Sequence, residues 1–378
     1  MKKLSDVVLK NPKGSQNKSE DNKSGKKIKV RFSGQSKRKR IILICAAVLI
    51  VLIAIFLIWF FLKGNFSSNS INKVGKPTDQ ITPRKFFSPL TGRETTEEKT
   101  KRTVTAVMIE NSPEARPQSG LKDAGVVFEA VAEGGITRFI ALYQEAEPSL
   151  IGPVRSARAY FLEWAAAFDP AVAHVGGSGD ALAMIHSGNY GVDLDQFYNA
   201  GAYWRAKDRA APHNVYTDFQ HLSDLEQKKG KTSSQFDSWP RTDGKASGTP
   251  NATSINLEPS SGQFAVHYDY DAATNTYKRS QGGKPHLDRE QGQIAPDVVI
   301  ALRVNQTLAS DDLHSNIQTT GSGDVYVFQN GAVIQGTWRK NSAKEQIHFY
   351  DQVGKEIELN HGQVWITAVA QGRKISWQ

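Results

Sequence analysis

Arginines at the start of a predicted helix are the residues whose types and spacing most clearly suggest chemistry. Arg155 and Arg158 stand three positions apart in GPVRSAR, directly before an alanine-rich run at 160–168 whose apolar residues have helical spacing. The N-terminus of a helix already carries about half a positive charge, so two cations there need a negative neighbour. Because arginine binds carboxylates and phosphates bidentately, we expect an acidic side chain or an anionic ligand beside them.

Further arginines and glycines gather in the same third of the chain. Arg116 lies in NSPEARPQSG, and Arg138 follows Glu133 and a Gly-Gly pair in EAVAEGGITR. Glu129 and Glu133 lie four apart in a predicted strand, so we expect their side chains to face the same side. Two interpretations remain open. The acids pair with the arginines in a structural network, or a polar cleft binds an anionic ligand through Arg116, Arg138, Arg155 and Arg158.

Two residues are candidates for general acid–base catalysis. His213 follows a proline in the loop-like stretch RAAPHNVYT. Glu133 stands before the Gly-Gly turn, where burial that raised its pKa would make it a proton donor. His174 lies in the apolar run PAVAHV, which is typical of a satisfied core histidine. No metal-ligand spacing such as H-E-x-x-H occurs, so we expect no metal and no cofactor.

The stretch GGSGD at 176–180 lies between a predicted strand and a predicted helix. It does not complete the nucleophile motif G-x-S-x-G, because Asp180 stands two positions after Ser178. It also lacks the Lys-Ser/Thr pair of a phosphate loop. The preferred interpretation is that Ser178 or Asp180 caps the following helix. The alternative is an anion bound at the N-terminus of that helix, with Ser178 among its ligands.

A run of 22 residues without charge at 41–62 predicts a transmembrane helix. At about 1.5 Å per residue it would be roughly 33 Å long, enough for a bilayer core of about 30 Å. Four basic residues at 37–40 precede it, and Lys63 is the only charge shortly after it. This asymmetry predicts a single-pass protein of the cell membrane, with a cytoplasmic N-terminus and the bulk of the chain extracellular. Residues 1–40 are expected to form a disordered basic arm.

The net charge of the whole chain, +9, is a poor indicator of nucleic-acid binding. The first 40 residues carry a net charge of +11, which leaves −2 for the rest of the chain. The part predicted to be external has no excess of basic residues, so we expect no nucleic-acid partner. Cys45, inside the apolar run, is the only cysteine, so the external part can form neither a disulfide nor a thiolate metal site.

Composition divides the remaining chain into four segments. Residues 63–100 are polar and contain Pro and Gly, which predicts a stalk whose FFSPLTG stretch docks on the edge of the folded domain. Residues 101–228 interleave strands and helices irregularly, with a hairpin at Gly134-Gly135, and predict a mixed α/β layer domain with an arginine-rich cleft. Residues 229–254 predict a linker. Residues 255–378 have mostly strand patterns, including an Asn330-Gly331 turn, and predict an antiparallel β domain, so the expected fold class is α+β.

Blocks along both halves of the chain resemble a known family. The stretches NSPEARPQSGL, AEGGITRFIALY, GPVRSARAYF, HVGGSGDAL, APHNVYT, GKPHLD and GTWRK resemble the YerB-like bacterial envelope proteins, a two-domain family of unknown function. The resemblance covers nearly all of 84–372. It departs at Ala159, where proline is expected, and in the anchor, a predicted transmembrane helix instead of a lipid. It implies an extracytoplasmic envelope protein. Its motif residues include Glu133, Gly134, Gly135, Gly176, Gly177, His213 and Asn214 besides the four arginines.

These observations lead to two expected functions. The first is a membrane-tethered module that binds an anionic envelope polymer or an envelope protein in the arginine-rich cleft. The second is an envelope hydrolase or lyase acting on wall glycan or phosphodiester, with Glu133 or His213 as acid or base. In the first, Arg155 and Arg158 oppose an acid such as Glu133 when the cleft is empty. They oppose an anionic ligand when it is occupied.

Overall fold

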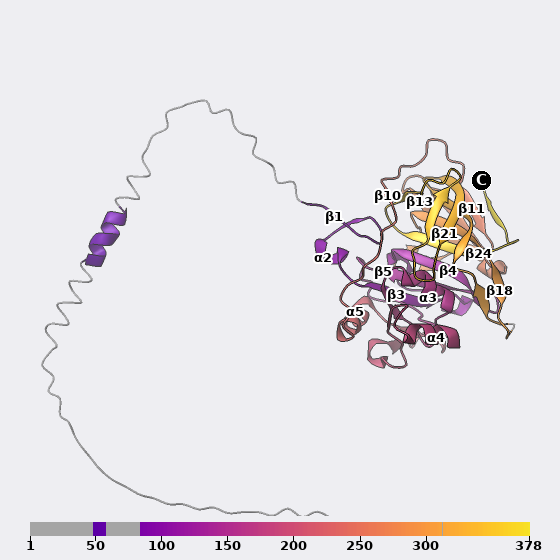
Figure 1. Ribbon diagram of the computed structural model, residues 1–378, viewed down its shortest axis with the longest axis horizontal. Coiled ribbons are helices and arrows are strands. Elements are labelled where there is room, and N and C mark those ends of the chain that lie inside the picture. The colour runs from indigo at the N-terminus through magenta and orange to yellow at the C-terminus, as the bar shows by residue number, and fades with distance from the viewer. Residues whose placement is uncertain (1–47, 58–83, 312) are drawn as a thin grey trace, which may run out of the picture. The chain divides into compact units, whose positions relative to one another are not determined.

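The structure is a computed structural model that describes residues 48–57, 84–311 and 313–378 (Figure 1). Residues 48–57 are helical and fall within the predicted span. No helix of the described residues is long and apolar enough to cross a membrane. The expected basic arm at 1–40, the rest of the span at 41–62 and residues 63–83 of the expected stalk lie outside the described residues. The chain divides into a unit that ends at Ile81 and a compact unit, Thr82–Gln378, which contains every candidate site residue.

Folded structure begins earlier than the sequence predicts. β1 (Phe86–Phe87) pairs with β2 (Glu94–Thr95), and α2 (Glu97–Thr100) follows. Leu90 is 1% exposed, and Ser88 Oγ donates a 2.8 Å hydrogen bond to Glu145. Residues 84–100 therefore belong to the fold and not to a stalk, because apolar burial and side-chain hydrogen bonds hold them against the rest of the unit.

A ten-stranded sheet forms the centre of the compact unit (Figure 1). Its order is β22 (His348–Asp351), β21 (Ala332–Lys340), β20 (Gly321–Gln329), β17 (Val298–Val304), β24 (Val364–Ala370), β4 (Val126–Glu133), β5 (Ile136–Tyr143), β3 (Val104–Glu110), β6 (Pro170–Ala173) and β7 (Val192–Asp193). β24 lies between β17 and β4 and runs parallel to both. The regions predicted at 101–228 and 255–378 thus share one sheet, because a strand from the C-terminal region pairs with the edge of the N-terminal strands.

The two faces of this sheet are covered by different layers. On one face, α3 (Ala159–Ala166) and α4 (Gly179–His186) enclose an apolar core in which Phe128 and Trp164 stack with ring centroids 5.5 Å apart. On the other face lie α5 (Phe219–Lys228) and a second, antiparallel sheet. The order of the second sheet is β14 (Lys284–Pro285), β13 (Thr276–Gln281), β12 (Val266–Asp271), β11 (Ser254–Leu257) and β25 (Ile375–Trp377). The N-terminal region is therefore mixed α/β, and the C-terminal region adds an antiparallel β sheet.

Local turn and helix predictions agree with the structure at several places. Gly134 and Gly135, with φ of 55° and 77°, form the β4–β5 turn, and Asn330-Gly331, with φ of 61° and 73°, forms the β20–β21 turn. The expected linker at 229–254 is packed instead of free, since Trp239 is 3% exposed and β10 (Arg241–Thr242) pairs with β23 (Leu359–Asn360). The remaining short strands are β8 (Trp204–Arg205), β9 (Val215–Tyr216), β15 (Leu287–Asp288), β16 (Gly292–Gln293), β18 (Gln306–Leu308) and β19 (Ser315–Ile317).

Candidate functional site

The polar residues singled out in the sequence meet where β3 and β4 end and β5 begins. Glu110, the last residue of β3, is the register partner of Arg138 in β5, so their side chains lie on the same face of the sheet, under α3. The backbone of Arg155 runs beside β3 and donates to the carbonyl of Met108 at 2.9 Å. This contact carries the segment that precedes α3 across the end of the strands, which places Arg155 and Arg158 beside Glu110 and Glu133.

Glu133 is the carboxylate that opposes Arg158. Arg158 Nη2 lies 2.6 Å from Glu133 Oε2, and Arg138 Nη2 contacts Oε1. Both arginine side chains are less than a tenth exposed, at 3% for Arg138 and 8% for Arg158. Burial by itself would raise the pKa of Glu133, but the two arginines outweigh it and hold that pKa below its ordinary value. This carboxylate therefore suits a permanently charged structural role better than that of a proton donor.

Glu129 does not face the same side as Glu133, so that prediction was wrong. The register of β4 against β5 shifts between Val131 and Glu133, which leaves Ala132 as an extra residue in the strand. Such a β-bulge breaks the two-residue alternation that the prediction assumed. Glu129, which precedes the bulge, points to the second sheet, where Arg279 Nη2 lies 2.9 Å from its Oε2 and both side chains are 0% exposed.

Arg155 pairs with Glu110, a residue that the sequence patterns did not single out. Arg155 Nε lies 3.2 Å from Glu110 Oε1, and His213 Nδ1 lies 3.0 Å from Glu110 Oε2. Ser112 Oγ lies 3.1 Å from Glu110 Oε1 and 3.3 Å from His213 Nδ1. The Glu110 side chain is 5% exposed, whereas those of Arg155 and His213 are 24% and 22% exposed. The sequence does contain a feature that could have identified Glu110. It is the glutamate at the end of VTAVMIE, a strand whose other residues are apolar or small.

The outer nitrogen atoms of Arg155 and His213 make no hydrogen bond or ion pair with the described residues. In the part of the chain that the structure describes, neither terminal nitrogen of the Arg155 guanidinium, nor Nε2 of His213, has a hydrogen-bond or ion-pair partner. Arg138 and Arg158, by contrast, each use a further nitrogen on a backbone carbonyl, Ser156 and Ala157 respectively. Arg155 and His213 are therefore the members of this cluster that can still accept a ligand.

Arg116 and Asn214 lie apart from this cluster. Arg116 donates to Asn111 Oδ1 at 3.1 Å and to the Gln263 carbonyl at 3.2 Å, and its guanidinium lies 5.2 Å from the Phe264 ring centroid. Burial lowers the pKa of Arg116 to about 10. It connects the residue after β3 to the turn between β11 and β12 of the second sheet. Asn214 accepts from Arg205 at 2.8 Å and donates to the Ala206 carbonyl, so it closes the loop that holds His213.

The glycine-rich stretch at 176–180 packs closely against neighbouring backbone. Gly176 N–H donates to Asp195 Oδ1 at 3.1 Å, and a Cβ on Gly177 would lie 3.2 Å from the Ala157 carbonyl, so both glycines permit close backbone packing. Ser178 occupies the N-cap of α4, but its side chain makes no capping hydrogen bond. His174 is 0% exposed and its ring lies between the Gly176 carbonyl and Asp193, as expected of a core histidine.

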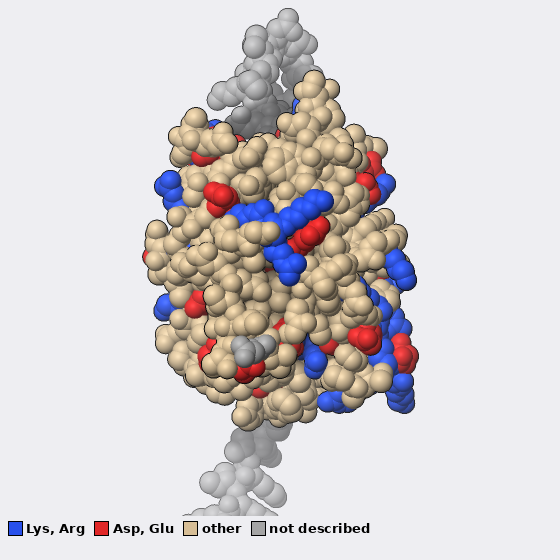
Figure 2. Space-filling view, turned by 90° about the vertical axis from the view of Figure 1, so that its right-hand side faces the viewer, with Lys and Arg blue, Asp and Glu red and all other residues tan. Residues whose placement is uncertain are grey.

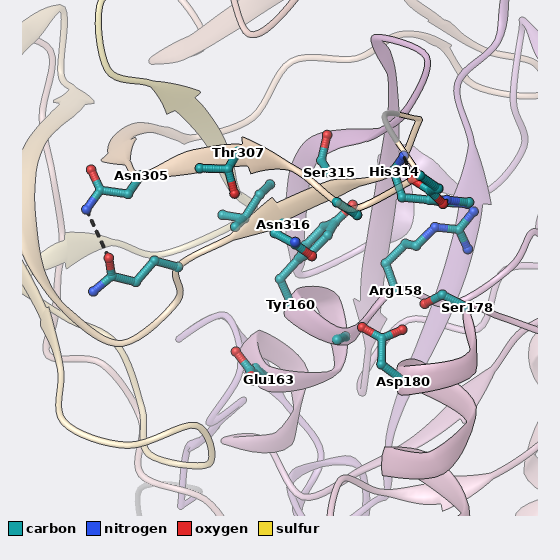
Figure 3. Close-up of a pocket in the computed structure, with 15 residues that line it drawn as sticks. Arg158, Tyr160, Glu163, Ser178, Asp180, Asn305, Thr307, His314, Ser315 and Asn316 are labelled. Carbon is teal, nitrogen blue, oxygen red and sulfur yellow. Dashed lines mark hydrogen bonds and ion pairs between the residues drawn. The ribbon is translucent and has the colours of Figure 1, made fainter.

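A groove of about 530 Å³ opens beside the cluster (Figure 3). One wall consists of residues from α3 and from the start of α4, together with the residues directly before them, among them Arg158, Glu163, Ser178 and Asp180. The other wall is the β18–β19 hairpin. The face that carries β18, turned to the viewer in Figure 2, is largely uncharged, with acidic and basic side chains interspersed. Within the described residues, no group of three or more His, Cys, Asp and Glu side chains is arranged to hold a metal ion.

Comparison with known proteins places the chain in a family. Residues 90–233 match the family described as "Protein of unknown function (DUF3048) N-terminal domain", and residues 255–366 match its "C-terminal domain". The chain is 33% identical over 294 residues to "Putative lipoprotein YerB" of Bacillus subtilis (strain 168), across 76% of this chain and 87% of the relative. The crystal structure of the Bacillus subtilis YerB protein is similar, with a TM-score of 0.70 and 31% identity, across 77% of this chain and 99% of that one. With both of its regions matched, the chain belongs to the YerB-like DUF3048 family.

Proposed function

We propose that this protein is a membrane-attached protein of the cell envelope that binds an anionic group of an envelope polymer or envelope protein at Arg155 and His213. The observation that carries the proposal is the unused half of the Arg155 guanidinium. Its Nε lies 3.2 Å from Glu110, while its two terminal nitrogens have no partner in the described part of the chain. A guanidinium whose two terminal nitrogens are both free can donate two hydrogen bonds to a carboxylate or a phosphate.

The charge of the cluster supports an anionic ligand. Three arginines, Arg138, Arg155 and Arg158, face two carboxylates, Glu110 and Glu133, so one positive charge is not compensated within the cluster. Partial burial strengthens its attraction for an anion, because the effective dielectric near the site is lower than that of water. The excess lies with Arg138 and Arg158, which share the single carboxylate of Glu133, and it adds to the positive potential at neighbouring Arg155.

Attachment to the membrane is proposed from the sequence. The uncharged run at 41–62, preceded by basic residues at 37–40, supports a single-pass anchor with a cytoplasmic N-terminus and an extracellular bulk. The relative described as a "Putative lipoprotein" supports attachment of the family to a membrane, with a different kind of anchor. A reporter fused after residue 378 would be accessible to protease in intact cells if this topology holds, and protected if it does not.

A second candidate function rests on His213. Its Nδ1 lies 3.0 Å from the buried Glu110 carboxylate, while Nε2 has no partner among the described residues. A carboxylate close to one imidazole nitrogen, with the other nitrogen free, is compatible with a general acid or base, which fits a hydrolase or lyase. Ser112 does not complete a catalytic triad, because its Oγ approaches the same nitrogen, Nδ1, that Glu110 contacts.

Calorimetric titration of the full-length protein with pyrophosphate tests the binding proposal. Arg155→Gln removes the free guanidinium and is expected to weaken binding by about tenfold or more, as for the loss of hydrogen bonds to a charged group. Arg339→Gln, which changes an exposed arginine on β21, is the matched control and should leave binding unchanged. Equal affinity of wild type and Arg155→Gln would contradict the proposal.

Incubation with purified wall material separates the two functions. If His213 acts as acid or base, His213→Gln abolishes turnover but retains pyrophosphate binding through Arg155. If the protein only binds, wild type and His213→Gln release no product.

A further inference from the structure

The groove beside the arginine cluster is lined on one side by uncharged polar side chains. Its far wall is the β18–β19 hairpin, in which Thr307 stands directly opposite Asn316. Asn305 and Gln318 lie two residues away from them along the chain, and side chains of alternate strand residues point to the same face. The hairpin therefore presents four amide and hydroxyl side chains to the groove (Figure 3).

These groups retain free hydrogen-bonding capacity. Asn305 Nδ2 donates to Gln318 Oε1 at 2.9 Å, and this bond orients both amides along the wall. The side chains of Thr307 and Asn316 have no hydrogen-bond partner in the described ranges. A row of amides and hydroxyls that both donate and accept is complementary to a ligand with many hydroxyl groups.

The opposite wall carries negative charge without a dedicated counter-ion. Asp180 Oδ1 accepts from its neighbour's backbone at 2.8 Å, and Glu163 Oε2 accepts from Thr319; the second oxygen of each has no hydrogen-bond or ion-pair partner within the residues described. The other charged groups of the groove are paired elsewhere: Arg158 with Glu133, and Asp311 with His314. Lys340 is near enough for its charge to interact with Glu163, but its ammonium donates to the carbonyls of Ser342 and Ala343.

We propose that this groove binds a short carbohydrate that carries free amino groups. The hairpin wall supplies hydrogen bonds to hydroxyl groups, and Glu163 and Asp180 supply carboxylates for an ammonium group. The volume of about 530 Å³ lies within the range of about 300–1,000 Å³ that is usual for small-molecule sites. The same carboxylates disfavour phosphate-bearing ligands, so this site is distinct from the anion site at Arg155.

Calorimetric titration of the full-length protein with a glucosamine trisaccharide tests this inference, with the fully N-acetylated trisaccharide as the uncharged comparison. The amino form is expected to bind about tenfold or more tightly than the acetylated form, because acetylation removes the ammonium charge. Asp180→Asn and Glu163→Gln are each expected to weaken binding of the amino form by a similar factor. Asp237→Asn, an exposed acid outside this groove, should leave it unchanged.

Independent variants separate the contributions of charge and hydroxyl contacts. Thr307→Ala and Asn316→Ala lie on the hairpin and should weaken both sugars, because they remove hydroxyl contacts that do not depend on charge. Arg155→Gln should leave sugar binding intact, so a failure of the anion site and a failure of the groove give different results. No binding of the amino trisaccharide, equal affinity for both sugars, or unchanged binding in Asp180→Asn and Glu163→Gln would overturn the inference.

Discussion

Arg279→Met tests the polar network that joins the second sheet to the back of the candidate site. Arg279 and Glu129 are both 0% exposed, and Arg279 Nη2 lies 2.9 Å and 3.1 Å from the two carboxylate oxygens. Arg279 also donates to His286 Nδ1 at 2.8 Å and to Tyr268 Oη at 2.7 Å. Burial, with the nearby Arg279, holds the pKa of His286 well below its ordinary value, which keeps its ring neutral and able to accept that bond.

Removing this cation leaves a buried carboxylate without its counter-ion. The expected loss is about 3–5 kcal/mol of unfolding free energy, the usual cost of breaking a buried ion pair by deleting one partner. Trp365 Nε1 and Thr367 Oγ1, at 3.1 Å and 3.2 Å, still donate to Glu129 but supply no positive charge. In the double variant Glu129→Gln/Arg279→Met the same groups can donate to a neutral amide. The double variant should therefore be more stable than the sum of the single losses predicts, by about 2 kcal/mol.

Urea unfolding of the full-length chain, followed by tryptophan fluorescence, measures both quantities. Arg289→Met is the matched control, because Arg289 pairs with Asp208 at the surface, where the side chains are 38% and 52% exposed. This control should lose less than about 1 kcal/mol. The predicted coupling is refuted if Arg279→Met costs no more than Arg289→Met, or if the two single losses at positions 129 and 279 are additive.

Three further predictions concern single groups. Glu133→Gln leaves Arg138 and Arg158 buried without a carboxylate, so it should lose about 3–5 kcal/mol in the same unfolding assay; a fully stable variant would contradict the structural role of Glu133. Burial raises the pKa of Glu226 from 4.5 to about 7, so the folded state holds its proton more tightly and stability falls as the pH rises from about 4.5 to about 7. Glu226→Gln removes this penalty, and melting curves should show it more stable than wild type above pH 7, by about 3 kcal/mol at most, and equal to it near pH 4; an unchanged pH profile would refute the assignment. Gly336→Ala would place a Cβ 1.8 Å from the Tyr350 carbonyl oxygen, which forces β21 and β22 apart. Circular dichroism melting should detect a loss of about 2 kcal/mol or more of unfolding free energy. An unchanged stability would show that the two strands separate at this point without cost.

Local features of the fold could be predicted because they depend on neighbouring residues. The Asn330-Gly331 turn, the Gly134-Gly135 turn and the helix after Arg158 follow from preferences that act over a few positions. The presence of a negative partner for Arg155 and Arg158 could also be predicted, since two cations at a helix start are unfavourable alone. Its identity could not, because Glu110 lies 45 positions before Arg155 and meets it only through the path of the chain across β3.

The sequence by itself determined the types of the reactive groups, the strand and helix periodicities and the uncharged run at 41–62, all of which are properties of short stretches. Tertiary structure decided which of these groups meet. One extra residue in β4 turned Glu129 and Glu133 to opposite faces, and pairing of β24 with β4 joined two regions of different composition into one sheet. The groove exists only because the β18–β19 hairpin lies against α3 and α4, which are more than a hundred positions earlier in the chain. Contacts over such separations depend on the packing of whole layers, and no spacing within a single segment encodes them.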